Sequence, residues 1–415
     1  MLLRQANSSG RMVSTSLSCL LCALVIVHEA VASTSTTKTR IDGFEHESGR
    51  DSWYVQVDGV MGGKSSGALD FTASGTTDDE QQNMKFTGTI SLDGGGFSSI
   101  RRRYAGDLLD LSDYAGVVVT LETQASSASV PPLGAELSFG DATSQYDFSS
   151  SFAVPLSANA NISSVYLPME SFDRGTFIGF LCRDGCSLDP SKIDSLSVYV
   201  LFQEGDFEVT IHSIEAVREP RAFPTPIIDA GTSQDIATLL QNTIASGGGL
   251  YDKSYVELCI AIYWSVLNSL VASPKVPESV KVVLCAGLER AAEIQNIDGV
   301  NEPAIAWALR YTIDAVLADL NGSERSIVES WLPTKAEADS MEVNCVGRTS
   351  VAQGILYNEE GNDVGGNMTV SATGWYSNKE DMEERATSAG HSSVSNKWIA
   401  SFVAWSWLVA AALHT

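Results

Sequence analysis

The sequence predicts two domains of different class, a β-sandwich or barrel followed by a compact antiparallel bundle of helices. Between residues 45 and 218, short apolar runs recur with turn residues between them, and in residues 86–92 the apolar residues occupy every second position. This alternation is typical of a half-buried strand. From residue 226 to 333 the apolar residues recur at helical spacing instead. A chain of 415 residues is long enough for each domain to bury a core.

The first domain is organised around a glycine-rich stretch, residues 53–103. Only glycine adopts positive φ without strain, so its glycine pairs predict tight corners between antiparallel strands. The residues that we assign to turns and core here are Trp53, Gly59, Met61, Gly62, Gly63, Gly95, Gly96 and Phe97. The alternative is a surface that grips a partner protein or a glycan, formed by Asp58, Lys64, Ser65 and Arg101. For the glycines the turn interpretation is favoured, because turns require them.

The charge of the chain argues against one class of partner. Acidic residues number 51 and basic residues 26, which gives a formal net charge of −25. This much negative charge disfavours nonspecific binding to nucleic acid or to an anionic membrane surface. Arg101, Arg102 and Arg103 form the basic cluster of this acidic chain. We expect them either to bind an acidic partner or to be a solvated strand end.

Four helices are expected in the second domain, after a linker marked by Pro220, Pro224 and Pro226. Ser233 is a candidate N-cap of the first helix, and the three glycines at 247–249 are its expected stop. The other helices are expected at about residues 254–272, 277–294 and 303–320. Short loops between them predict a bundle.

Two interpretations apply to the polar residues of these helices. Arg310 and Asp314 are four residues apart on one helix face, which predicts a surface ion pair. The sharper hypothesis is a buried ligand site at Tyr251, Cys259, Tyr263 and Arg310.

Three motifs of the first domain resemble a known family. Asp-Gly-Val-Met-Gly-Gly occupies residues 58–63, Gly-Gly-Phe occupies 95–97, and Leu-Pro-Met-Glu-Ser-Phe occupies 167–172. With these motifs the domain resembles the complex I intermediate-associated protein, a mitochondrial assembly factor with relatives outside mitochondria. The resemblance implies a jelly-roll sandwich of galactose-binding-like fold, which many carbohydrate-binding modules share. It also implies a role in assembly of the respiratory NADH:ubiquinone oxidoreductase. The Gly-Asp-Gly segment usual in the family is replaced here by a loose Ser/Ala/Pro stretch at 124–132.

Both ends of the chain have features of targeting signals. Arg4 and Arg11 precede an apolar run at 17–27 and then Ala-Val-Ala at 30–32, which predicts a secretory signal peptide over residues 1–32. A mitochondrial presequence and an uncleaved anchor are the alternatives. Small residues from Ser388, a polar spacer and an apolar tail at 398–413 resemble a GPI-attachment signal, with Ser388 as the candidate site. A tail anchor or a buried helix is the alternative, and residues 334–397 are expected to form an acidic polar stalk.

Cysteines and glycosylation motifs agree with an extracytoplasmic chain. Cys182 and Cys186 are a candidate disulfide, which an oxidising compartment permits. For Cys259 and Cys285 a buried thiol is the default and a disulfide the alternative. Asn161, Asn321 and Asn367 are acceptors for N-glycans if the chain is secreted, as in a glycoprotein.

These observations predict a noncatalytic binding protein, tethered to a membrane outside the cytoplasm and chaperone-like or partner-holding in function. No nucleophile–base–acid set, metal cluster or phosphate loop can be assembled in the first domain, so no catalytic residue, cofactor or metal is expected. The expected partner is a protein or a glycan, with the membrane contacted through the tail or a GPI anchor. Alternatives are a mitochondrial assembly factor, a cell-surface carbohydrate-binding module, and a small-ligand or enzymatic site in the helical domain.

Overall fold

The computed structural model describes residues 38–42, 44, 52–73, 82–104, 106, 108–123, 130–154, 162–177, 180–182, 186–221, 223, 225, 227–228, 230–295, 301–325, 329–341 and 343. The predicted signal peptide at 1–32 and apolar tail at 398–413 lie outside the described residues. So do Asn161, Asn367, Ser388 and nearly all of the predicted stalk.

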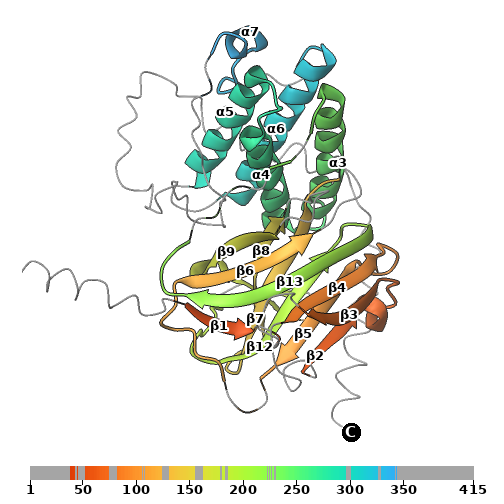
Figure 1. Cartoon of the computed structure of the whole chain (residues 1–415), viewed down its shortest axis with the longest axis vertical. Helices are drawn as coiled ribbons and strands as arrows, with labels where there is room; N and C mark the ends of the chain where they lie inside the picture. The colour runs from red at the N-terminus through yellow and green to blue at the C-terminus, as the bar shows by residue number, and fades with distance from the viewer. Residues whose placement is uncertain are drawn as a thin grey trace, which may run out of the picture.

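The first domain is a sandwich of two antiparallel sheets (Figure 1). One sheet has the order β3 (Ser66–Ala73), β4 (Gln82–Ile90), β13 (Gly205–Val217), β6 (Gly116–Thr123) and β9 (Ile162–Pro168), with β1 (Lys38–Asp42) paired to β13. The seven-stranded sheet has the order β11 (Phe180–Leu181), β10 (Arg174–Phe177), β8 (Asp147–Val154), β7 (Leu133–Asp141), β12 (Ile193–Leu201), β5 (Phe97–Arg103) and β2 (Trp53–Val57). The predicted sandwich class is confirmed.

Alternation along the strands builds the core between the two sheets. In β13, Phe207, Val209 and Ile211 are buried, whereas the residues between them are more exposed. Phe86 from one sheet and Phe139 from the other are fully buried. Burial of an aromatic or aliphatic side chain of this size contributes about 1.5–3 kcal/mol, so this two-residue period decides which face of each strand is internal.

The second domain contains the four expected helices, α3 (Ser233–Tyr251), α4 (Val256–Ala272), α5 (Glu278–Gln295) and α6 (Glu302–Asn321), and then the short α7 (Lys335–Ala338). Two local predictions were wrong. The N-cap of α3 is Thr232, which forms a capping box with Asp235, rather than Ser233. The three glycines do not end α3, because Gly247 packs directly against the Tyr263 ring of α4 and the helix continues to Tyr251.

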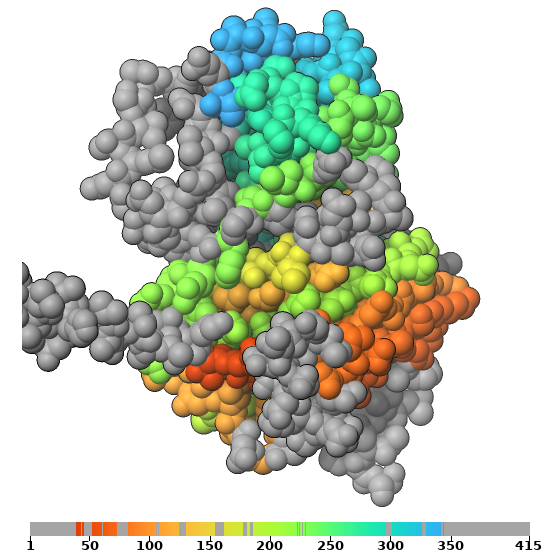
Figure 2. Space-filling view, viewed as in Figure 1, coloured from red at the N-terminus to blue at the C-terminus, as the bar shows by residue number. Residues whose placement is uncertain are grey.

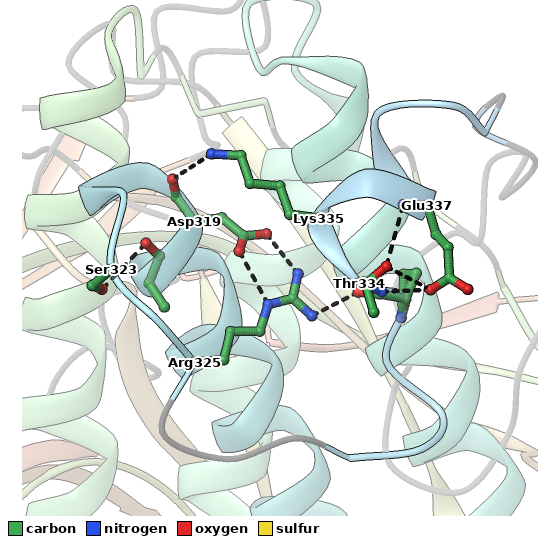
Figure 3. Close-up of polar contacts among 8 residues, drawn as sticks. Asp319, Ser323, Arg325, Thr334, Lys335 and Glu337 are labelled. Atoms are coloured by element: carbon green, nitrogen blue, oxygen red, sulfur yellow. Dashed lines mark hydrogen bonds and ion pairs between the residues drawn. The ribbon is translucent and has the colours of Figure 1, made fainter.

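Polar contacts hold the end of α6 to α7 (Figure 3). The Arg325 guanidinium donates to both Asp319 carboxylate oxygens, at 3.0 and 2.6 Å, and to the Pro333 carbonyl at 2.6 Å. Lys335 Nζ donates to the Asp319 carbonyl at 3.3 Å. Thr334 forms a capping box with Glu337 and so begins α7 beside this cluster.

The helical bundle lies on one side of the β-sandwich (Figures 1 and 2). It packs against the outer face of the seven-stranded sheet. Helix α4 contacts β7 and β8, and its Leu258 and Ile262 lie over Gly134 of β7. Phe97, Tyr199, Leu201 and Phe202 pack against the hydrophobic core of the bundle rather than that of the sandwich. Every residue of β7 is buried. Its inner face meets the sandwich core, and its outer face meets the bundle at Gly134. No helix within the described ranges is long and apolar enough to cross a membrane.

The glycines of α3 offer a matched test of helix packing. A Cβ at Gly247 would lie 2.2 Å from the Tyr263 ring, whereas a Cβ at Gly248 would meet nothing within 4 Å. We expect Gly247→Ala to lower the free energy of unfolding by about 1–3 kcal/mol through overpacking. Gly248→Ala should raise it by up to about 1 kcal/mol, because alanine favours the helix. Thermal or urea unfolding followed by circular dichroism measures both, and equal effects of the two variants would contradict this packing.

Candidate functional site

The carboxylate of Asp58 is the centre of the glycine-rich corner. Asp58 begins η1 (Asp58–Met61) and has no solvent exposure. Its oxygens accept hydrogen bonds from Ser65 N at 3.0 Å and Ser65 Oγ at 2.6 Å, and from Gly96 N at 2.6 Å and Phe97 N at 3.2 Å. Asp58 and the buried Ser65 therefore do not line a surface, and the binding role suggested for them is replaced by a structural one.

The glycines of this corner are needed for two different reasons. A Cβ at Gly63 or at Gly95 would lie 2.2 Å from the Asp58 side chain. Gly62 and Gly96 instead have φ of +86° and +148°, which L residues rarely adopt. Gly59 has neither constraint, since the nearest atom to its Cβ would be a Val57 methyl at 3.8 Å.

The remaining residues assigned to this corner are divided between core and surface. Trp53 is buried and its Nε1 donates to Asp42 at 2.9 Å. Met61 is 47% exposed, so its assignment to the core was wrong. Lys64 lies at the surface and pairs with the exposed Asp93, a kind of ion pair that contributes little to stability.

The hydrogen bonds to the Asp58 carboxylate also lower its pKa. Burial alone would raise the pKa of this carboxyl, but the hydrogen bonds from Ser65, Gly96 and Phe97 outweigh burial and lower the pKa below 3.8. Carboxylates that accept several hydrogen bonds in this way are stabilised in the ionised form.

The three consecutive arginines point to opposite faces of β5. Arg102 faces inward, where it pairs with the buried Asp42 and lies over the Tyr104 ring at 5.0 Å. Arg101 and Arg103 face outward, and Arg101 lies over the Tyr199 ring at 5.0 Å while its Nε donates to Ser99 Oγ at 3.2 Å. Arg102 is thus not part of a binding surface, because adjacent residues of a strand alternate between its faces.

The register of the seven-stranded sheet assembles a polar row across its outer face. Directly paired residues run from β2 to β10 in the order Tyr54, Arg101, Ser197, Ser138, Ser149 and Arg174. Small serines thus occupy the middle of the row, and an arginine lies on each side of them. Tyr54 is 42% exposed, and the three serines are buried. We call this the Arg101 row.

A second polar row lies next to it, in the order Arg103, Ser195, Gly140, Asp147 and Thr176. Burial raises the pKa of Asp147, and the positive charges of Arg101 and Arg103 offset this effect only partly. The two rows place two outward arginines, a carboxyl group and several hydroxyls on one face. Tyr54, Asp147 and Tyr199 belong to this face and were missed from the sequence, although the alternation of Tyr54 with Trp53 and Val55 could have identified the first.

The residues of the suggested helical ligand site do lie close together. Tyr263 OH shares hydrogen bonds with Arg310 and Cys259, and Trp307 Nε1 donates to Tyr251 OH at 3.2 Å. Burial raises the pKa of the Cys259 thiol to about 12, so the thiolate nucleophile is scarce at neutral pH. Arg310 also forms the expected ion pair with Asp314 at 3.1 Å. These contacts show a packed polar cluster.

The remaining candidate residues are the cysteines, the glycosylation acceptor Asn321 and any group able to hold a metal ion. Cys182 is bonded to Cys186, and Cys285 is also disulfide-bonded, whereas Cys259 is free and buried. Asn321 is the exposed last residue of α6. Within the part of the chain that the structure describes, no group of three or more His, Cys, Asp or Glu residues is arranged to hold a metal ion.

We expect Asp58→Asn to lower the free energy of unfolding by about 2–4 kcal/mol, because an amide nitrogen would face backbone donors. Asp93→Asn at the same corner should change it by no more than about 0.5 kcal/mol. The pKa of Asp58 is lower in the folded protein than the ordinary value of 3.8. The stabilisation that its ionised carboxylate gives is therefore complete above pH 3.8 and is lost as the pH falls through the pKa of the folded protein. Urea unfolding at several pH values measures this. If the free energy of unfolding of Asp58→Asn stays below that of the wild type by the same amount down to the lowest pH, the stabilising role of the ionised Asp58 is contradicted.

Comparison with solved structures shows likeness to carbohydrate-binding modules. The chain is similar to a family 11 carbohydrate-binding module from Clostridium thermocellum in complex with a β-1,3-1,4-mixed-linked tetrasaccharide, with 13% identity and a TM-score of 0.32, over 43% of this chain and 95% of that one. It is also similar to a family 30 carbohydrate-binding module, with 14% identity and a TM-score of 0.27, over 40% and 81% of the two chains. At such identities the likeness concerns the fold alone.

An exo-β-agarase is similar over 44% of this chain and 25% of its own length, with 13% identity and a TM-score of 0.30. The search of curated proteins found no match. The family model described as complex I intermediate-associated protein 30 (CIA30) matches residues 43–211, which confirms the resemblance seen in the motifs at 58–63 and 95–97. Over these residues the β-sandwich of this chain is therefore similar to the CIA30 family.

Proposed function

We propose that this protein is a noncatalytic, chaperone-like binding protein that holds a partner protein through the β2 and β5 end of the outer face of its seven-stranded sheet, where Tyr54 and Arg103 are exposed. The observation that carries the proposal is the Arg101 row, with Tyr54 and Arg101 at the end of the sheet opposite the edge strands β10 and β11. Tyr and Arg are the residue types that dominate binding energy at protein interfaces.

Arg101 is held in place before any partner arrives. The Tyr199 ring lies beneath its guanidinium, and its Nε is bonded to Ser99, whose Oγ in turn donates to the Gln56 carbonyl at 2.9 Å. A guanidinium fixed in this way loses less conformational entropy on binding than a free one. Its planar fork suits carboxylates, so an acidic segment of a partner is the favoured ligand. A glycan is the second candidate, because the carboxyl group of Asp147, which is only partly buried, can accept hydrogen bonds from sugar hydroxyls.

The similarity to the CIA30 family favours a role in protein assembly. Association with complex I intermediates is what the name of the family describes, and holding one subunit until another binds requires a binding face rather than catalytic groups. Assembly of NADH:ubiquinone oxidoreductase in mitochondria therefore remains the alternative to a partner-holding role elsewhere.

For location, we propose an extracytoplasmic membrane face. The Cys182–Cys186 disulfide and the bonded Cys285 support an oxidising compartment. The apolar segments at both ends of the sequence support a cleaved signal and a tail or GPI anchor.

The binding face is tested by removing its charges. We expect the double variant Arg101→Ala, Arg103→Ala to recover at least about tenfold less of the partner that copurifies with the wild-type chain, since truncation of an interface arginine commonly costs more than 1 kcal/mol. The control is Lys85→Ala, Arg218→Ala, which removes the same charge away from this face. Binding to a panel of immobilised glycans distinguishes the second candidate. Wild-type binding of both partner and glycans by the Arg101 and Arg103 variant would refute the proposed face.

The location is tested with an internal tag near residue 375. Release of the tagged chain from cells by phosphatidylinositol-specific phospholipase C, together with a loss of mass after removal of N-glycans, is the expected result. A mitochondrial product without glycans would contradict the location and favour assembly of complex I.

A further inference from the structure

An excess of carboxyl groups lies where the helical bundle meets the sandwich. Arg174 of β10 is surrounded by Glu136 of β7, Glu257 of α4, Glu302 of α6 and its own neighbour Asp173. We call these five residues the junction cluster. It contains four acidic side chains and one basic one, so three negative charges are uncompensated when all of its members are ionised.

Arg174 connects the two domains. Its guanidinium donates to Glu257 Oε2 at 3.2 Å and to the Ser254 carbonyl at 3.3 Å, and it lies over the Tyr255 ring at 4.3 Å. Its side chain is only 9% exposed. Tyr255 stacks in turn on Phe202 of the sandwich, with ring centroids 4.8 Å apart.

The surplus carboxyls are not satisfied by Arg174 alone. Glu136 is 6% exposed and accepts a hydrogen bond from Ser151 Oγ at 3.2 Å, beneath the bundle. Glu302 faces Glu257 and Asp173, and burial and then their negative charges raise the pKa of its carboxyl group. Placing further uncompensated charge in this junction is costly, because buried ions lose their hydration.

We propose that the junction cluster is a proton-operated latch: the bundle stays docked on the sheet while Glu136 and Glu302 hold protons and loosens when both ionise. The latch stands independently of what the sheet binds. Loosening would expose more of the outer face of the seven-stranded sheet, because Glu136 is covered by the docked bundle and lies beside the Arg101 row on β7.

The sign of the effect follows from the groups that face the latch. For Glu136, burial raises the pKa from 4.5 to about 7, with Glu257 adding to this effect and Arg174, Ser151 and Ser149 opposing it. For Glu302, burial and then the charges of Glu257 and Asp173 raise the pKa from 4.5 to about 7, against Arg174. Tyr199 and Tyr255 also face the cluster, and burial raises the pKa of both hydroxyls, so they stay neutral throughout this range.

Because both folded pKa values are raised, docking is strongest below pH 4.5, weakens between pH 4.5 and 7, and is weakest above pH 7. Each carboxyl weakens docking by about tenfold per pH unit within this window.

Hydrogen–deuterium exchange of the full chain between pH 5 and 8.5, corrected for the intrinsic rate, tests the latch. We expect protection of peptides from β8, β10 and the start of α4 to fall by at least about tenfold as the pH rises, while β6 in the sandwich keeps its protection. In Glu136→Gln, Glu302→Gln the fall should disappear, because glutamine keeps the shape without the charge. The control Glu278→Gln, Glu293→Gln changes two exposed carboxyls of α5 and should behave as the wild type.

The wild-type profile tests the proposal even if a variant folds poorly. Protection at the junction that is independent of pH in the wild-type chain would overturn the latch, as would a fall that persists in Glu136→Gln, Glu302→Gln with β6 intact. A parallel increase in the radius of gyration by small-angle X-ray scattering above pH 7 is the expected support from a second method.

Discussion

The buried carboxylate of Asp58 is the interaction on which the arrangement of the sandwich corner depends. It follows β2 directly, and it accepts hydrogen bonds from Ser65 just before β3 and from Gly96 and Phe97 at the start of β5. The turn between β2 and β3 and the start of β5, which lie 38 residues apart at Asp58 and Gly96, therefore meet at one ionised group. Since β5 carries Arg101 and Arg103, the position of the polar outer face is set by the same corner.

The helical bundle covers part of one face of the seven-stranded sheet, so the two faces of that sheet differ in character. Its inner face has the apolar side chains of an ordinary sandwich, such as Leu137 and Phe139. Its outer face keeps polar residues although much of it is buried, and Glu136 lies beneath the bundle among serines. Polar groups that remain in such a place cost stability unless they are paired. Retention of carboxyl groups there is better explained by control of docking than by stability alone.

The sequence was sufficient for the class of the fold and for the number of long helices, because periods of 2 and 3.6 residues are local signals. It failed where a distant residue decides the outcome. The three glycines look like a helix stop, but Tyr263 of the next helix makes Gly247 a packing position. Met61 looks like a core residue, but the corner around Asp58 turns it outward. The excess of carboxyls around Arg174 comes from four separate elements and has no local signature.

The arginine cluster shows why the candidate site belongs to the sheet rather than to a motif. In the sequence, residues 101–103 form one basic patch, yet the strand divides them, and Arg102 neutralises the buried Asp42. The face then depends on pairing: Arg101 acquires its neighbours Tyr54 and Ser197 from strands that lie about 50 and 100 residues away in the chain. A shift of either pairing by one residue would replace these neighbours with core residues. The proposed binding face therefore depends on the register of the seven-stranded sheet, which the corner at Asp58 and the docked bundle hold from two sides.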